Sequence, residues 1–183
     1  MQIRIIACLL LIGSAVSHAQ SGGFVQGSFD TGTYSMSSEN ADHAAYGFDV
    51  RMGTFSRAWR DFYRYVGIGA QRYYLANPNS AGTSKNGFDP QAKNEISSVF
   101  LMGGIALNTP ISPFVEIGGH LADWSNGELA QAGHTGRNGF VRAGLDIKSR
   151  DDFWLQIYYK YTSLEEVPVK KMVTAGLSVG VAF

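Results

Sequence analysis

The chain ends in Met172–Phe183, which reads MVTAGLSVGVAF. Side chains of a β-strand point alternately to two faces, so this stretch divides into two sets. One set is apolar and ends in an aromatic ring: Val173, Ala175, Leu177, Val179, Val181 and Phe183. The other set is small and uncharged: Thr174, Gly176, Ser178, Gly180 and Ala182. The pattern predicts a strand with one apolar face, and we interpret it as the closing strand of a β-barrel.

Seven further stretches alternate in the same way and are separated by residues typical of turns. The eight predicted strands are Gly23–Tyr34, Ala44–Thr54, Phe62–Tyr74, Ile96–Leu107, Phe114–Ala122, Gly139–Lys148, Phe153–Thr162 and Met172–Phe183. The seventh is the most informative, because its Phe153, Leu155, Ile157, Tyr159 and Tyr161 face carries aromatic rings at both ends and aliphatic side chains between them. This is the profile of a lipid-facing strand whose rings lie at the two water interfaces. In the third strand we place Val66, Ile68 and Ala70 outward, which also sends Arg64 and Arg72 outward.

The predicted connections alternate in length. Four are long and polar: Ser35–His43, Ala76–Glu95, Asp123–Asn138 and Ser163–Lys171. Three are shorter: Phe55–Asp61, Asn108–Pro113 and Ser149–Asp152. Long loops at one end and short periplasmic turns at the other are typical of outer-membrane barrels. The alternation predicts an even number of strands with both termini on the periplasmic side.

The N-terminus predicts export. Arg4 precedes an apolar run, Ile5–Val16, and Ser17-His18-Ala19 places small residues at the positions that a signal peptidase requires. We therefore assign residues 1–19 to a signal peptide and 20–183 to one barrel domain. Cys8 is the only cysteine, so the mature chain has no disulfide. No later stretch has the roughly 20 apolar residues of a membrane helix, which leaves a closed barrel as the way to cross a bilayer.

Alternation alone does not say which face points inward. A soluble barrel of the lipocalin type hides its apolar face and exposes the other to water. The second face of Met172–Phe183 has no charge and no large polar group, so it is a poor water-facing surface. It suits a narrow lumen, where small and large side chains must interlock. We therefore predict an all-β fold, an eight-stranded antiparallel up-and-down transmembrane β-barrel.

This pattern resembles the small eight-stranded outer-membrane barrels of the OmpA transmembrane-domain, OmpX and opacity type. The C-terminal residues Val179, Val181 and Phe183 resemble the signal that the barrel-assembly machinery reads, although Ser178 stands where that family usually has glycine. The resemblance implies a location in the outer membrane of a Gram-negative cell envelope. It also implies contact with outer-membrane lipid and lipopolysaccharide.

The inward phase assigns a set of charged and polar side chains to the lumen: Gln26, Asp30, Asp49, Arg51, Glu116, His120, Arg142, Asp146, Gln156 and Lys160. Glu116 and Arg142 fall at similar heights on neighbouring strands, and we expect them to pair because a buried charge without a partner is very costly. This network is expected to fill the barrel. The alternative is that it lines a narrow, gated channel.

The sequence gives little support for an enzyme. Lipid A deacylases, which are barrels of this size, use a His-x-Ser-Asn motif that faces lipid. Here Ser125 and Asn126 are present, but Asp123 occupies the histidine position and His120 has the inward phase. His43 and His134 fall in loops, and the spacings match no metal-ligand set. We predict no catalytic site, no metal and no cofactor.

The remaining candidates lie at the outer rim, where Arg72, Arg137, Lys170 and Lys171 are positioned to meet lipopolysaccharide phosphates. Removal of Arg4 with the signal peptide leaves 14 basic against 15 acidic residues, so no nucleic-acid partner is expected. The leading hypothesis is a non-enzymatic barrel that acts in envelope integrity or in surface interaction through its extracellular loops, with a partner that the sequence does not identify. A channel and a lipid A-modifying enzyme are the alternatives.

Overall fold

The computed structural model describes residues 21–36, 42–59, 61–76, 94–126, 138–148, 153–164 and 169–183. The predicted signal peptide, 1–19, lies outside the described residues, as do most residues of the four long connections. The described residues form eight strands: β1 (Ser21–Met36), β2 (Asp42–Trp59), β3 (Phe62–Leu75), β4 (Asn94–Leu107), β5 (Ile111–Asn126), β6 (Gly139–Lys148), β7 (Phe153–Ser163) and β8 (Val169–Ala182). Within these residues there is no helix that is long and apolar enough to cross a membrane.

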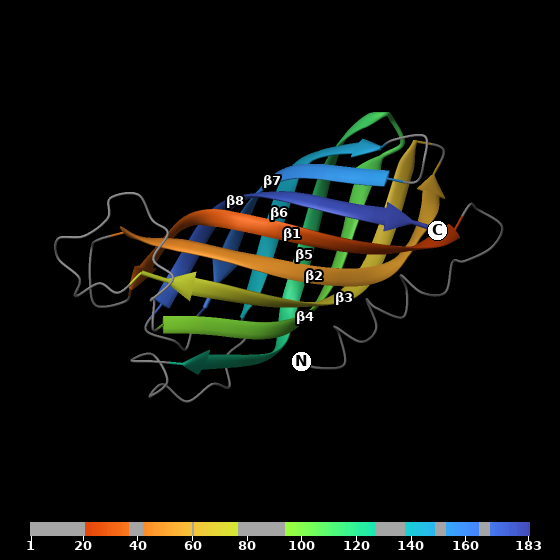
Figure 1. Cartoon of the computed structure of the whole chain (residues 1–183). Coiled ribbons are helices and arrows are strands. Elements are labelled where there is room, and N and C mark those ends of the chain that lie inside the picture. The colour runs from red at the N-terminus through yellow and green to blue at the C-terminus, as the bar shows by residue number, and fades with distance from the viewer. Residues whose placement is uncertain are drawn as a thin grey trace.

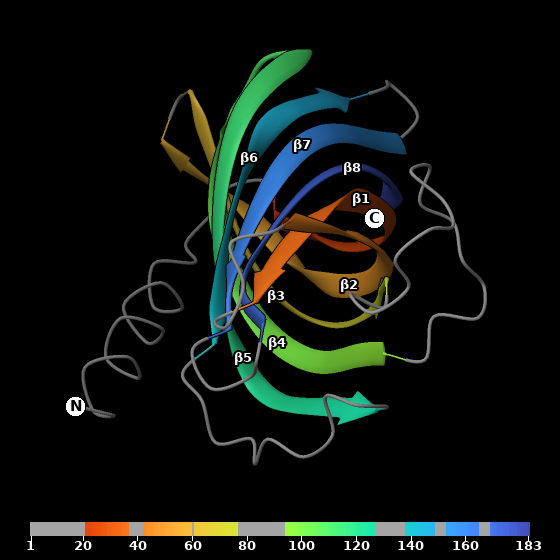
Figure 2. The ribbon, with the colours of Figure 1, turned by 90° about the vertical axis from the view of Figure 1, so that its left-hand side faces the viewer.

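The strands form one closed barrel in which each pairs with its neighbours in sequence and β8 pairs with β1 (Figures 1 and 2). All pairs are antiparallel. Gly27 lies opposite Val179, and the backbone N–H of Gly23 donates to the carbonyl of Phe183 at 2.7 Å. The prediction that Met172–Phe183 closes a barrel is confirmed. Closure matters physically because it leaves no sheet edge with unpaired backbone groups.

The barrel has two different ends. At the loop end, the long connections join β1 to β2, β3 to β4, β5 to β6 and β7 to β8. At the short-turn end, β2 is joined to β3, β4 to β5 and β6 to β7, and the C-terminus lies there too (Figure 1). In the β4–β5 turn the backbone N–H of Asn108 donates to the carbonyl of Asp61 at 2.8 Å, which links two neighbouring turns.

Some strands are longer than predicted. We expected a turn over Phe55–Asp61, but β2 continues to Trp59 because Arg57 and Trp59 pair with Tyr63 and Phe62 of β3. We also expected a loop from Asp123, whereas β5 continues to Asn126 by pairing with the start of β4. Turn-like composition therefore underestimates strands whose ends continue to pair with a neighbouring strand.

The predicted phases are those that the structure shows. On β3, Ile68 and Arg72 are exposed whereas Tyr65 and Tyr73 are buried, which confirms the phase that sends the arginines outward. On β7, Trp154, Gln156, Tyr158 and Lys160 are all buried. The lumen therefore holds the polar face of the strands, and the apolar face covers the outside.

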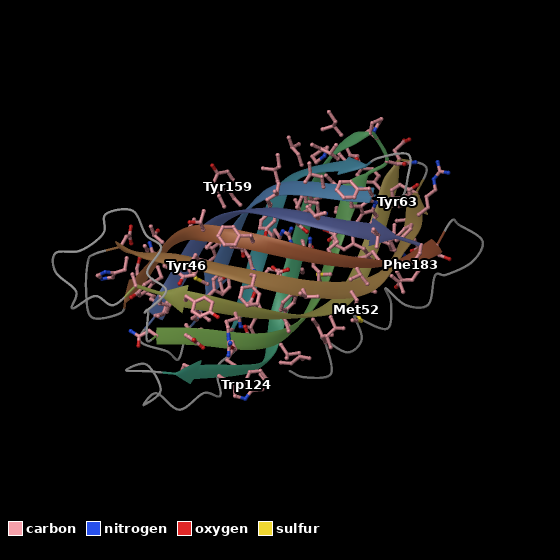
Figure 3. The ribbon with its side chains drawn as sticks, viewed as in Figure 1. Tyr46, Met52, Tyr63, Trp124, Tyr159 and Phe183 are labelled. Atoms are coloured by element: carbon pink, nitrogen blue, oxygen red, sulfur yellow. The ribbon has the colours of Figure 1, made fainter. Side chains whose placement is uncertain are left out.

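The outer surface is apolar along its middle and aromatic toward its two ends. Among its exposed side chains are Val50, Ile117, Leu145 and Leu177, together with Met52 between the aromatic residues (Figure 3). Tyr46, Trp124 and Tyr159 lie toward the loop end, and Tyr63 and Phe183 lie toward the short-turn end (Figure 3). An apolar band flanked by rings is the surface of a barrel that spans a bilayer.

The apolar band predicts that a charged side chain placed on it lowers the free energy of unfolding, and that the loss is larger the nearer the charge lies to the bilayer centre. Leu177 lies at mid-barrel opposite Phe29 and Ile157, whereas Val173 lies nearer the loop end opposite Tyr161. We expect Leu177→Arg to lower the free energy of unfolding in lipid vesicles by about 2–4 kcal/mol, and Val173→Arg by about 0–1 kcal/mol. Urea unfolding followed by tryptophan fluorescence measures both. An equal cost at the two sites, or none at Leu177, would contradict the lipid-facing assignment.

Candidate functional site

The centre of the lumen holds an ion pair between Arg51 of β2 and Glu116 of β5. Nη1 of Arg51 lies 2.8 Å from Oε2 and 3.0 Å from Oε1 of Glu116, and both side chains are about 1 % exposed. Nη2 of Arg51 donates to Oε1 of Gln156 and, at 3.3 Å, to the hydroxyl of Ser178. One guanidinium thus joins β2, β5, β7 and β8 across the inside of the barrel.

Arg142 of β6 forms the second part of this cluster. It lies directly opposite Glu116 in register, with Nη1 3.8 Å from Oε1 of the carboxylate. It also donates to Oε1 of Gln156 at 3.0 Å, and its guanidinium lies 3.3 Å from the centre of the Tyr158 ring. The predicted Glu116–Arg142 pair is therefore present. The closer partner of Glu116 is Arg51, which comes from a strand that is not its neighbour.

Lys160 of β7 occupies the next layer toward the loop end. Its Nζ donates to Oε1 of Gln71 at 2.7 Å and lies 3.6 Å from Asp49 and 3.9 Å from Asp30. The carboxylate of Asp30 also accepts hydrogen bonds from the hydroxyls of Tyr73 and Tyr158. The ammonium group therefore faces two carboxylates, which offsets the cost of burying it.

His120 and Asp123 lie together at the loop end of the lumen, His120 by the regular alternation of β5 and Asp123 because of a β-bulge that follows His120. The register between β4 and β5 shifts at Val99 and Phe100, which pair with Ala122 and His120. Strict alternation would send Asp123 outward with Leu121, but the bulge turns it inward, where its Oδ1 lies 2.9 Å from Nδ1 of His120. Asn138 donates to the other oxygen of Asp123 at 2.6 Å. The His120 side chain is about 1 % exposed, so it faces the lumen and not lipid.

Apolar layers lie on both sides of the charges. Toward the loop end, one cluster consists of Tyr34, Ala45, Tyr73, Leu75, Ile96, Leu164, Val169 and Met172. A second extends from the short-turn end: Phe24, Tyr65, Phe100, Met102, Ala106, Phe114, Phe140, Trp154 and Tyr158. Arg51, Arg142 and Lys160 are among the largest fully buried side chains. Within the described residues, the interior is thus filled by side chains, as expected for a barrel of this size.

The other predicted residues fall in three places. Asp49 and Asp146 are buried in the lumen, at 2 % exposure each. Val179, Val181 and Phe183 are exposed on the outer surface. At the loop-end rim Lys170 and Lys171 are exposed, and Arg72 contacts the hydroxyl of Ser97 at 3.1 Å and the carboxylate of Glu95 at 3.4 Å. Arg137 lies outside the described residues.

Sequence reasoning missed several luminal polar groups, among them Gln71, Tyr73 and Tyr158. Gln71 links Lys160 to Ser98 and His120, with its Nε2 2.8 Å from the Ser98 hydroxyl and 3.1 Å from Nε2 of His120. Tyr73 and Tyr158 bind Asp30. Their inward phase was readable from the sequence, but their partners lie on strands that are distant in sequence. Among the described residues, no group of three His, Cys, Asp or Glu side chains is placed to hold a metal ion.

The buried cluster predicts a stability difference between two ion pairs. Glu116→Gln leaves Arg51 without its anion in the lumen, and loss of one partner of a buried pair costs about 3–5 kcal/mol. Glu95→Gln removes a partly exposed pair with Arg72, which is worth less than about 1 kcal/mol. Urea unfolding of both folded variants in the same vesicles gives the comparison. A loss of less than about 1 kcal/mol for Glu116→Gln would show that the luminal pair does not stabilise the barrel.

Comparison with known proteins identifies the fold. The structure resembles that of Neisserial surface protein A, with a TM-score of 0.62, 17 % sequence identity and coverage of 90 % of this chain and 99 % of that one. It also resembles Ail, the attachment invasion locus protein of Yersinia pestis, crystallised in complex with the heparin analogue sucrose octasulfate. There the TM-score is 0.51 and the identity 12 %, with coverage of 90 % of this chain and 99 % of that one.

No protein-family profile matches the chain, and no curated protein matches it by sequence. At these identities the likeness shows the fold and no more. The chain has the fold of the small eight-stranded outer-membrane barrels, as its sequence pattern implied.

Proposed function

We propose that this chain is a non-enzymatic, integral outer-membrane protein that acts in envelope integrity or surface interaction through the loop end of the barrel. Its apolar outer band and its likeness to outer-membrane barrels support the location. The filled lumen is the observation that supports a role at the rims of the barrel instead of inside it. Arg51, Glu116, Arg142 and Lys160 are each about 1 % exposed, so the described side chains leave no open passage past this cluster. The rims are then the surfaces at which an aqueous partner can bind.

The loop end is the better candidate of the two rims. It carries the longest connections of the chain, and loops on a rigid scaffold are common binding elements. Neisserial surface protein A is named for the cell surface, and Ail for attachment and invasion. In the proposed orientation the loop end is extracellular and the C-terminus is periplasmic. Arg72, Lys170 and Lys171 then belong to the outer leaflet, where lipopolysaccharide phosphates are the anions available to them.

Nothing in the described lumen favours catalysis on lipid. The Nδ1 atom of His120 contacts Asp123, and both side chains face the interior. A lipid-modifying enzyme needs its reactive side chains on the outer surface or at the rim. The geometry of His120 and Asp123 instead matches hydrogen-bonded structural groups.

Loop deletion tests the proposed role. Residues 79–92 and 128–136 are each replaced by Gly-Ser, which leaves every described strand intact. We expect the variant to keep heat-modifiable migration on a gel, because the barrel is stabilised by its strands and lumen. We expect it to lose the protein's effect on survival of expressing cells in deoxycholate, or on their adhesion to immobilised heparin. The control variant carries Gly-Ser inserted at Asn108–Pro110, in a turn at the opposite end. Unchanged survival and adhesion in the deletion variant would contradict a role for the loops.

A narrow, gated channel is the alternative, and the row of charged side chains through the lumen is the observation that favours it. The two functions differ in conductance. We expect the purified barrel in a planar bilayer to pass no steady current, because the described lumen is filled. A steady current that changes with Arg51→Gln would assign the protein to the channels instead.

A further inference from the structure

A groove of about 380 Å³ lies on the outer surface toward the short-turn end. Its apolar lining comes from Gly103 and Ile105 of β4 and from Val115 and Ile117 of β5. Ala58 and Arg64 of the β2–β3 hairpin complete it, with contributions from Tyr65 and Gly104. Figure 2 shows the gold end of this hairpin projecting beyond the barrel wall.

The groove exists because a lipid-facing position has no side chain. Gly103 has the outward phase and lies between Val66 of β3 and Ile117 of β5 in register. A Cβ atom built on Gly103 would meet only the Tyr65 carbonyl oxygen at 3.7 Å and a Val66 methyl at 3.8 Å. These are ordinary contacts, so the fold does not require glycine here. The missing side chain leaves a depression in the apolar surface.

Arg64 gives the groove a charged end. It is the one charged residue of the lining, and its Nε donates to the hydroxyl of Ser56 at 3.0 Å, which orients the guanidinium. Arg64 lies opposite Ile105, two residue pairs nearer the short-turn end than Val66 and Gly103. The exposed Arg57 belongs to the same hairpin. Polarity therefore runs from a cationic end at the rim to an apolar end toward mid-barrel.

We propose that this groove binds a single anionic glycerophospholipid, with one acyl chain over Gly103 and the headgroup phosphate at Arg64. In a leaflet, the headgroup of a phospholipid lies at the water interface and its acyl chains lie nearer the bilayer centre. Arg64 at the rim and Gly103 toward mid-barrel have the same order. The inference rests on the proposed function, because it requires the barrel to lie in a bilayer with its short-turn end in the phospholipid leaflet. A guanidinium is well suited to bind a phosphate oxygen pair.

A second groove near the loop end does not share these properties. It is lined by Phe48, Val50, Ala70 and Trp124 with Arg72, and has a volume of about 330 Å³. It lies at the loop end, where the proposed function places lipopolysaccharide. The Arg64 groove lies at the short-turn end, which the proposed function places in the phospholipid leaflet, so the Arg64 groove is the one that we assign to a phospholipid.

Native mass spectrometry of the folded barrel in detergent tests the charge. The protein is titrated with phosphatidylglycerol or with phosphatidylcholine, and the singly bound complex is counted. We expect one saturable phosphatidylglycerol complex and weaker binding of phosphatidylcholine. Arg64→Gln should weaken phosphatidylglycerol binding about tenfold, because it removes one charge-assisted contact, and Arg72→Gln should not. Equal binding of the two lipids, or equal effects of the two substitutions, would overturn the proposal.

Filling the groove tests the position of the acyl chain. Gly103→Leu places a side chain in the groove, whereas Gly27→Leu adds the same side chain on β1, where a Cβ would meet only a backbone oxygen at 4.0 Å. We expect Gly103→Leu to abolish the saturable complex and Gly27→Leu to preserve it. Retention of the complex in Gly103→Leu would overturn the groove assignment.

Insertion into phospholipid vesicles, followed by heat-modifiable migration, is measured on the same samples. If the barrel inserts but substitutions at Gly103 and Arg64 do not change its lipid binding, the lipid-binding groove is refuted and the proposed function is not. A barrel that does not insert refutes the proposed function and the groove together.

Discussion

The contact between Arg51 and Glu116 is the interaction on which the rest of the barrel depends. A buried charge without a partner is very costly, so the lumen can hold its cations only where carboxylates meet them. Among the described residues the fully buried charges are three cations, Arg51, Arg142 and Lys160, and four carboxylates, Asp30, Asp49, Glu116 and Asp146. They come from β1, β2, β5, β6 and β7, and the contacts among them hold the polar faces of these strands inward.

The small residues of β8 follow from the same constraint. Tyr158 and Asp30 bind each other over Gly176, where a Cβ atom would lie 2.2 Å from an Asp30 oxygen and 2.5 Å from the Tyr158 ring. At Ser178 the short side chain leaves room for the Arg51 guanidinium, to which its hydroxyl binds. The small, uncharged face of the closing strand is thus the space that large luminal side chains from other strands occupy. With the charged and large polar side chains inside, the apolar face is left for lipid outside.

Much of this arrangement was predictable from the sequence, because alternation with period two fixes the phase of a strand without any knowledge of its partners. The eight strands, their order and the inward charges all follow from it, as does the pairing of Glu116 with Arg142, since neighbouring strands set that register. Contacts across the lumen do not follow in this way. The Arg51–Glu116 pair depends on the diameter and stagger of the closed barrel. Asp123 was expected in a loop, but it lies on β5 and faces the lumen, because one extra residue at the β5 bulge reverses the alternation and no residue type signals that bulge.

A single-cysteine scan along β7 tests the central claim, a lipid-facing apolar surface around a filled lumen. The predicted mature chain has no cysteine, so a spin label can be attached at one position at a time from Leu155 to Tyr161 in vesicle-reconstituted protein. Labels at Leu155, Ile157 and Tyr159 should be accessible to oxygen dissolved in the lipid, while those at Gln156, Tyr158 and Lys160 should be accessible neither to oxygen nor to a water-soluble nickel chelate. Access of the nickel chelate to the first set would indicate a soluble barrel, and its access to the second set would indicate a water-filled lumen. Either result would contradict this account.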